Sequence, residues 1–81
     1  MKARVHVFYK DSVFDPQGNT VGESLRRVGF SKVKGVRIGR VIDLDVDYTH
    51  KDEARREIGK MCESLLANPV IESFKCEILE G

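Results

Sequence analysis

The stretch VKGVRIGRVIDLDVDY, residues Val33–Tyr48, decides the fold. Apolar residues fall on its even positions, namely Val36, Ile38, Ile42, Leu44, Val46 and Tyr48, whereas Arg37, Asp43, Asp45 and Asp47 fall on odd ones. Successive side chains of a β-strand point to opposite faces, so this parity predicts a strand with one apolar and one charged face. A two-residue turn at Gly39 and Arg40 would mix apolar and acidic residues on each face, and we disfavour it.

Two arrangements of this stretch remain. One is a single long strand bent at Gly35 and Gly39, and the other is a three-residue loop centred on Gly39, with Val36 opposite Ile42. The parity runs unbroken through Gly39, which favours the long bent strand. At about 3.3 Å per residue such a strand spans about 50 Å, longer than a domain of this size. Part of it would therefore pair with another subunit.

The residues before this stretch predict a strand and a helix. Residues 3–9 alternate, with Val5, Val7 and Tyr9 on one face. Asp15 is a good N-cap, and Pro16 suits the first position of a helix because its missing N–H has no partner there. The apolar positions of this helix are Val21, Leu25 and Val28, and Gly29 is expected to end it.

The residues after it predict a second helix and a final strand. Thr49 is expected to cap the helix, with Asp52 as its capping-box partner. One apolar stripe at helical spacing comprises Ala54, Ile58, Met61, Cys62, Leu65 and Leu66. Asn68 is expected to terminate the helix in a left-handed conformation, and Pro69 cannot continue it. The strand, about residues 71–79, places Phe74, Cys76 and Ile78 inward.

The order strand, helix, long strand, helix, strand indicates an α+β fold. Sheets with one apolar face are usually antiparallel, with helices stacked on that face. We therefore expect a two-layer sandwich related to the ferredoxin-like fold, formed by residues 1–81 as a single domain, with an antiparallel sheet completed by dimerisation.

Composition narrows the class of protein. The chain has 81 residues, of which 41% are hydrophobic, which excludes a disordered tail. Its formal net charge of +1 gives no electrostatic reason to bind nucleic acid or an anionic membrane. Two cysteines are too few for a disulfide framework, and residues 1–10 lack a signal-peptide pattern. These features predict a cytoplasmic domain whose small core needs an oligomer.

The residues that carry chemistry are sparse. His6, His50, Cys62 and Cys76 lack metal-ligand spacing, and the glycines match no phosphate-binding loop. Asp43, Asp45 and Asp47 are expected to form a solvated strand face. Gly18 is unusual because it occupies the third position of a helix, where a helix former would be more stable by nearly 1 kcal/mol. We expect it to permit close backbone approach, either by a neighbouring subunit or by a ligand at the helix end.

Three blocks carry a resemblance to a known family. They are Asp15-Pro16-Gln17-Gly18, Val36-Arg37-Ile38-Gly39-Arg40, and Met61-Cys62-Glu63 with Leu65-Leu66-Ala67-Asn68-Pro69-Val70-Ile71-Glu72. In this order and at this length the chain resembles the PurS subunit of phosphoribosylformylglycinamidine synthase. Ser73-Phe74 stands where the family commonly has an acidic residue and Tyr, and Asn19-Thr20 is not its commonest continuation of the first block.

The resemblance implies a non-catalytic subunit of an enzyme of purine biosynthesis. That enzyme converts formylglycinamide ribonucleotide, glutamine and ATP into formylglycinamidine ribonucleotide. The implied partners are a second copy of the chain, in a dimer or tetramer, a large synthetase subunit and a glutaminase subunit. The small subunit would bridge the two and help to keep ammonia from solvent. No cofactor is expected on this chain; Mg-ATP or Mg-ADP and glutamine would bind at the level of the complex.

By transfer from the family, nine residues are candidates for contact with these partners: Asp15, Pro16, Gln17, Gly18, Arg37, Gly39, Arg40, Asn68 and Pro69. A second interpretation is a free-standing ferredoxin-like regulatory domain that binds an amino acid at a dimer interface. In that case the helix end at Gly18 would take the ligand's carboxylate.

Overall fold

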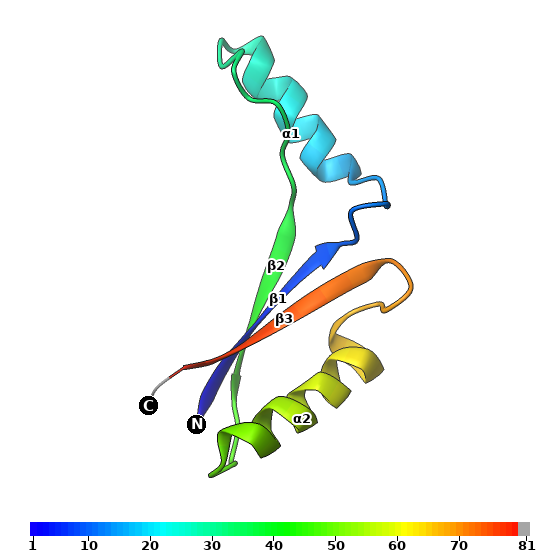
Figure 1. The fold of residues 1–81 in the computed structure, drawn as a ribbon. Coiled ribbons are helices and arrows are strands. Elements are labelled where there is room, and N and C mark those ends of the chain that lie inside the picture. The colour runs from blue at the N-terminus through cyan, green and yellow to red at the C-terminus, as the bar shows by residue number, and fades with distance from the viewer. Residues whose placement is uncertain (80–81) are drawn as a thin grey trace.

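The computed structural model describes residues 1–79, as three strands, two α-helices and a short π-helix (Figure 1). In chain order the elements are β1 (Lys2–Tyr9), α1 (Pro16–Arg27), β2 (Gly39–Asp45), α2 (Lys51–Met61), η1 (Cys62–Leu66) and β3 (Glu72–Leu79). The predicted α+β class and the order of its elements are confirmed.

The sheet is antiparallel throughout, with the order β2-β1-β3. On the central strand, Val5 lies opposite Ile42 of β2 and Cys76 of β3. The alternation of β1 buries Ala3, Val5 and Val7 on one face of the sheet. α2 covers this face, and the buried side chains that it and the following turn contribute to the core are Ala54, Ile58, Cys62 and Ala67. The core therefore lies between one helix and the sheet.

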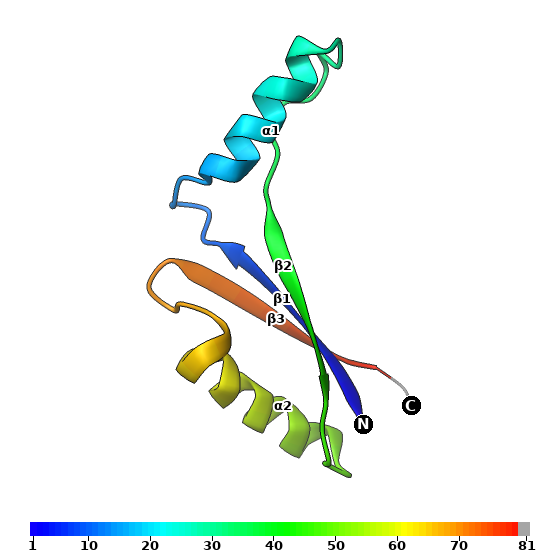
Figure 2. The same ribbon diagram turned by 180° about the vertical axis from the view of Figure 1, so that it is seen from behind.

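The long middle stretch does not fold back on itself. Gly39 pairs with Phe8 of β1, so the predicted loop that places Val36 opposite Ile42 is wrong. The alternative, in which the stretch continues in one direction through Gly39, is confirmed. The regular strand is seven residues long rather than sixteen. Residues 33–38 continue from it as an irregular segment beside α1 (Figure 2). This segment lies next to a helix instead of a second strand, which is why it forms no ladder.

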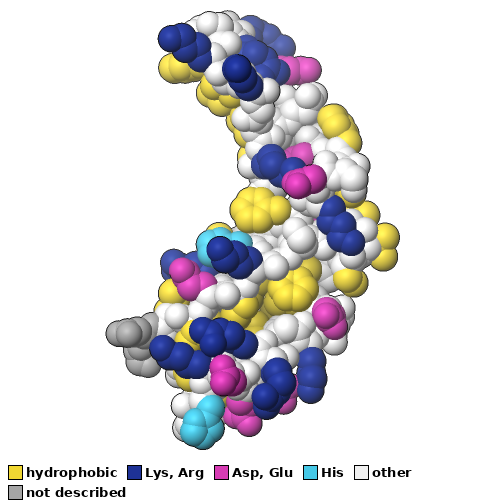
Figure 3. All heavy atoms as spheres, in the orientation of Figure 1, with side chains coloured by type: hydrophobic (Ala, Val, Ile, Leu, Met, Phe, Trp, Pro, Cys, Tyr) yellow, Lys and Arg dark blue, Asp and Glu magenta, His cyan; other side chains and the backbone are white. Residues whose placement is uncertain are grey.

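The two helices differ in position from the expected stacking on one face. α2 packs against the sheet, whereas α1 lies beyond the end of the sheet, so the molecule is an open arc (Figures 1 and 3). α1 begins and ends as predicted: Asp15 is its N-cap, Pro16 is its first residue, and Gly29 follows it with a φ of 113°.

Three details of the second helix differ from expectation. His50 is the N-cap instead of Thr49, and its side chain makes no capping hydrogen bond. Asn68 is not left-handed, because no residue other than glycine has a positive φ in the described chain. Leu65 is 83% exposed instead of inward. The cause is the wider turn of η1, in which the N–H of Ala67 donates to the carbonyl of Cys62 five residues earlier.

Among residues 1–79, neither helix is long or apolar enough to cross a bilayer.

Candidate functional site

The first family-like block and the middle one meet at Asp15. Its Oδ1 accepts a hydrogen bond from the N–H of Gly18 at 2.9 Å, and its Oδ2 accepts one from the N–H of Ile38 at 2.7 Å. One carboxylate thus caps α1 and fastens the helix to the segment that leads into β2. The Gly18 N–H, and after it the Ile38 N–H, hold the pKa of Asp15 below its usual value.

Gly18 is required by close approach of the chain to itself. A Cβ at this position would lie 2.3 Å from the carbonyl oxygen of Val36 and 2.7 Å from Oδ2 of Asp15. One turn later Gly22 would place its Cβ 3.5 Å from Val36, an ordinary contact. The close approach expected at Gly18 is therefore real, but Val36 of the same chain makes it, and neither a ligand nor a subunit is needed to explain the glycine. We call Asp15, Gly18, Val36 and Ile38 the Asp15 cluster.

The Asp15 cluster also bears on the regulatory-domain interpretation. That interpretation needs free N–H donors at the start of α1 to hold the carboxylate of an amino acid. The carboxylate of Asp15 already occupies the N–H of Gly18. The N-terminal end of α1 is therefore capped by a side chain of the protein. The Gly18 N–H is then not available to bind the carboxylate of an amino acid, as the regulatory-domain interpretation requires.

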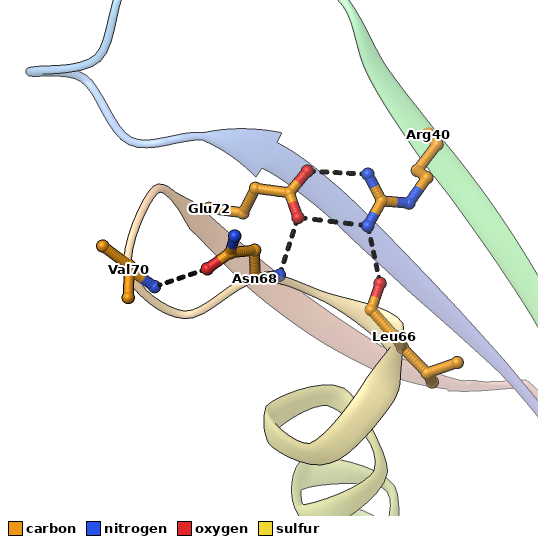
Figure 4. Close-up of polar contacts among 5 residues, drawn as sticks. All are labelled: Arg40, Leu66, Asn68, Val70 and Glu72. Carbon is orange, nitrogen blue, oxygen red and sulfur yellow. Dashed lines mark hydrogen bonds and ion pairs between the residues drawn. The ribbon is translucent and has the colours of Figure 1, made fainter.

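The middle block and the third block meet at Arg40 (Figure 4). Arg40 lies opposite Val7, and its guanidinium reaches across β1 to Glu72 at the start of β3, with contacts of 2.6 and 3.1 Å to the two carboxylate oxygens. Its Nη2 also donates to the carbonyl of Leu66, at 2.6 Å. Arg40 thus joins β2, β3 and the end of η1, and it satisfies a carbonyl that the helix end leaves without a partner.

Asn68 completes this arrangement. Its backbone N–H donates to Oε1 of Glu72 at 2.7 Å, and its Oδ1 accepts from the N–H of Val70 at 3.1 Å. Arg40 first, and then the Asn68 N–H, hold the pKa of Glu72 below its usual value. Asn68 therefore shapes the turn before β3 through its side chain and backbone, and not through a left-handed conformation. We call Arg40, Leu66, Asn68 and Glu72 the Arg40 cluster.

The five other candidate residues are exposed, and one of them, Gly39, also has a role in packing. A Cβ on Gly39 would lie 2.5 Å from the ring of Phe8, so this glycine lets the ring lie over β2. Arg37 donates to the carbonyl of Tyr9 and to Asp11, an exposed ion pair that contributes little to stability. Pro16 and Gln17 are exposed and border a hollow of about 450 Å³ with Thr20, Val21 and Ile38. Pro69 is exposed in the turn before β3.

The sequence-based candidate list thus contains two of the four members of each cluster, but not the residues with which those members form their contacts. Glu72 was present in the third block, and its charge opposite to that of Arg40 is the signal that points to the pair. The other partners are backbone groups of Val36, Ile38 and Leu66. Their contacts cannot be predicted from the sequence, because every residue has the same backbone groups.

The described residues that could carry chemistry lie apart from one another, in ion pairs or in the core. Within residues 1–79, no three His, Cys, Asp or Glu side chains lie close enough together to hold a metal ion. Burial raises the pKa of the thiols of Cys62 and Cys76, which keeps them protonated and poorly nucleophilic. Asp43 pairs with Arg4 at 2.8 Å on the open face of the sheet.

The pattern of the PurS family, described as phosphoribosylformylglycinamidine (FGAM) synthase, matches residues 2–80. The chain belongs to the PurS family. The PurS subunit of Archaeoglobus fulgidus is 43% identical over 74 residues, which are 91% of this chain and 92% of that protein. The family resemblance carried by the three blocks is thereby confirmed. PurS is a subunit of FGAM synthase, an enzyme of purine biosynthesis and a ligase.

Solved PurS structures have the same fold. Bacillus subtilis PurS superposes with a TM-score of 0.87 at 39% identity, covering 98% of each chain. A chain in the structure of PurLQS from Thermotoga maritima gives a TM-score of 0.86 at 37% identity, covering 96% of this chain and 95% of that one. The open arc, with α1 beyond the sheet, is consequently a shape that PurS chains share.

Proposed function

We propose that residues 1–81 act as one non-catalytic unit that bridges the synthetase and glutaminase subunits of FGAM synthase in the cytoplasm. The observation that carries the proposal is the full-length likeness to a chain in PurLQS of Thermotoga maritima. Mg-ATP or Mg-ADP and glutamine then bind at the level of the complex. The bridging unit is a homodimer or homotetramer of this chain.

The chemistry of the described residues supports a bridging role. Both clusters hold segments of the chain in place, and neither leaves a reactive group facing an enclosed cavity. Alignment of two active sites requires a rigid part between them, because ammonia released at one site must reach the other before it escapes into water. The Asp15 and Arg40 clusters supply such rigidity at the start of β2, the first by tying the segment before the strand to α1 and the second by tying the strand to β3.

Among the nine candidate residues, we propose that those outside the Asp15 and Arg40 clusters contact the partner subunits and that the members of the two clusters position them. Pro16 and Gln17 lie beside the apolar hollow at the start of α1, and Pro69 lies in the turn at the far side of the Arg40 cluster. Asp15, Gly18, Arg40 and Asn68 hold those three residues in place through contacts within the chain.

Reconstitution tests the function. The synthetase and glutaminase subunits are mixed with and without this chain, in the presence of Mg-ATP and formylglycinamide ribonucleotide, and product formation is measured from glutamine and separately from ammonium chloride. We expect synthesis from glutamine to require this chain and synthesis from ammonium to persist without it. Equal synthesis from glutamine with and without the chain would refute the bridging role.

A matched pair of variants tests the contact residues. Gln17→Ala is expected to raise the concentration of this chain that half-saturates glutamine-dependent synthesis by about tenfold, the loss typical of an interface residue worth somewhat more than 1 kcal/mol. Asn19→Ala, also exposed on α1, is the control and should leave that concentration unchanged. Equal behaviour of the two variants would remove Gln17 from the interface.

A further inference from the structure

The turn between η1 and β3, residues 67–71, is exposed at its tip and yet fully hydrogen-bonded. Every backbone N–H of residues 67–72 donates to an acceptor of the same chain at 2.7–3.1 Å, apart from Pro69, which has no N–H. In residues 31–35, the loop after α1, only the N–H of Val33 has an acceptor within the described chain. Segments with few such bonds open locally at little cost in free energy. The turn of residues 67–71 is, by contrast, held in one shape.

The carboxylate of Glu72 closes this turn (Figure 4). Its Oε1 accepts from the N–H of Asn68 at 2.7 Å, and its two oxygens accept from the guanidinium of Arg40 at 3.1 and 2.6 Å. The backbone N–H of Glu72 donates in return to the carbonyl of Asn68, at 2.7 Å. The side chain of Glu72 is only 11% exposed, and hydrogen bonds to a charged group are the stronger kind. One residue thus fixes the turn through both its side chain and its backbone.

The closed turn presents apolar side chains to solvent. Val70 is 77% exposed, and Pro69 beside it is exposed as well. The carbonyl of Ile71 accepts from the N–H of Lys10 at 2.9 Å, which fastens the turn to the loop that leads to α1. Proline has a fixed φ and valine a stiff χ1, so neither side chain has much freedom to lose. A protein that buries them therefore binds with a small loss of conformational entropy.

Pro69 is among the residues proposed above to contact the partner subunits, and the present inference rests on that proposed function. We propose that Glu72 is a positioning residue for glutamine-dependent synthesis, because it holds the turn in the shape that brings Val70 into an apolar pocket of the partner subunit. Val70 makes the contact, whereas Glu72 acts only through the turn. The effect of Glu72 consequently falls on the affinity between the subunits and not on the rate of the assembled enzyme.

A double-mutant cycle in the reconstituted complex tests this assignment. Val70→Ala is expected to raise the concentration of this chain that half-saturates glutamine-dependent synthesis about tenfold. Glu72→Ala is expected to raise it about threefold. Saturating amounts of either variant should restore the wild-type rate. The chain with both changes should lie within twofold of Val70→Ala, because a positioned turn has no effect without the side chain that it positions.

Additive losses, about thirtyfold in the chain with both changes, would mean that Glu72 does not act through the turn and would overturn the inference. A saturating rate that stays low in Glu72→Ala would overturn it too. Glu77→Ala is the matched control, at an exposed glutamate of the same strand, and should leave the half-saturating concentration unchanged. Circular dichroism checks that every variant stays folded.

Amide hydrogen exchange in the chain alone tests the positioning itself. The N–H groups of Asn68 and Ile71 are expected to exchange slowly in the wild type, because both have acceptors within the chain. In Glu72→Ala both should exchange at least tenfold faster, while the N–H groups of α2 keep their rates. Equal exchange at Asn68 and Ile71 in the two chains would show that Glu72 does not hold the turn.

The inference and the proposed function fail in different ways. If glutamine-dependent synthesis requires this chain but Val70→Ala behaves like the wild type, the bridging role stands and the contact assigned to Val70 is wrong. If synthesis does not require the chain, both are wrong. If Val70→Ala weakens the association of copies of this chain with one another, measured by sedimentation of the chain alone, the turn belongs to the interface between copies and the inference is wrong.

Discussion

The arm of the molecule, residues 11–38 with α1, and its body, the sheet with α2, are built in different ways. The body is held by a core in which Val5, Val7 and Ile58 are fully buried. The arm has no such core and is held by the Asp15 cluster, in which one carboxylate and one glycine fix the helix to a neighbouring segment. The body is therefore held by burial of apolar side chains, whereas the arm has a defined position but an uncovered apolar face. The difference indicates that the arm's shape serves contacts outside its own chain.

The largest expected effect is in the body. Ile58→Ala should lower the free energy of unfolding by about 2–5 kcal/mol, because it leaves a cavity in a small core. Val28→Ala on the arm should cost less than about 0.5 kcal/mol at protein concentrations below the dimer dissociation constant. Urea denaturation measures both. Equal decreases in the free energy of unfolding of the two variants would show that arm and body share one core, and would contradict the distinction between them.

The second effect concerns the joint of the arm. Gly18→Ala should cost about 1–3 kcal/mol, because the Val36 carbonyl must move away and strain the hydrogen bond from Ile38 to Asp15. Gly59→Ala is the matched control in α2, where a Cβ meets nothing within 4 Å, and it should stabilise the chain slightly. Gly22→Ala should be tolerated. If Gly18→Ala changed the free energy of unfolding as little as the other two substitutions, the Val36 carbonyl would move away from α1 more easily than the contact distance indicates.

The third effect concerns the joint of the body. Arg40→Ala should cost about 1 kcal/mol, because Glu72, with a side chain only 11% exposed, loses its cation and the Leu66 carbonyl loses a donor. Asp43→Asn removes the exposed ion pair with Arg4 and is expected to leave stability unchanged. The two variants are compared by thermal denaturation. A greater loss from Asp43→Asn would contradict the structural role of the Arg40 cluster.

The smallest effect is a dependence on pH. The folded state lowers the pKa of Asp15 and of Glu72, so the unfolded chain binds more protons in the acid range. The stability that both carboxylates contribute is complete above their unfolded pKa values, about 4, and is lost as the pH falls through their folded values. Denaturation midpoints between pH 2 and pH 7 measure this slope. Asp15→Asn should reduce it, whereas a slope unchanged in this variant would mean that Asp15 does not bind more tightly to its donors when ionised.

The sequence predicts the body of the fold well and the arm only in part. The parity of residues 33–48 and the alternation of β1 and β3 identify the buried faces because side chains on a strand alternate strictly. The boundaries of α1 follow from Asp15, Pro16 and Gly29, whose backbone preferences are local, whereas the predicted caps of the second helix, Thr49 and a left-handed Asn68, were wrong. The place of α1 is not local, because it depends on the hydrogen bond between Ile38 and Asp15, 23 residues apart.

The candidate site shows the same division. Family-like blocks identify Asp15, Gly18, Arg40 and Asn68, but three of their partners are backbone groups, which every residue possesses and no pattern distinguishes. The exposure of Leu65 was likewise hidden, because a regular helix period places it inward and only the π-turn of η1 rotates it out. This rotation moves an apolar side chain to the surface.

The most direct test of the account is the mass of the wild-type chain in solution, measured by light scattering across a range of micromolar concentrations. If arm and body are completed by another copy, the particle should have at least twice the 9.2 kDa mass of one chain. A mass of 9.2 kDa throughout, in a chain that retains its helices, would mean that the arm's apolar face has no partner of its own kind, and it would contradict the account.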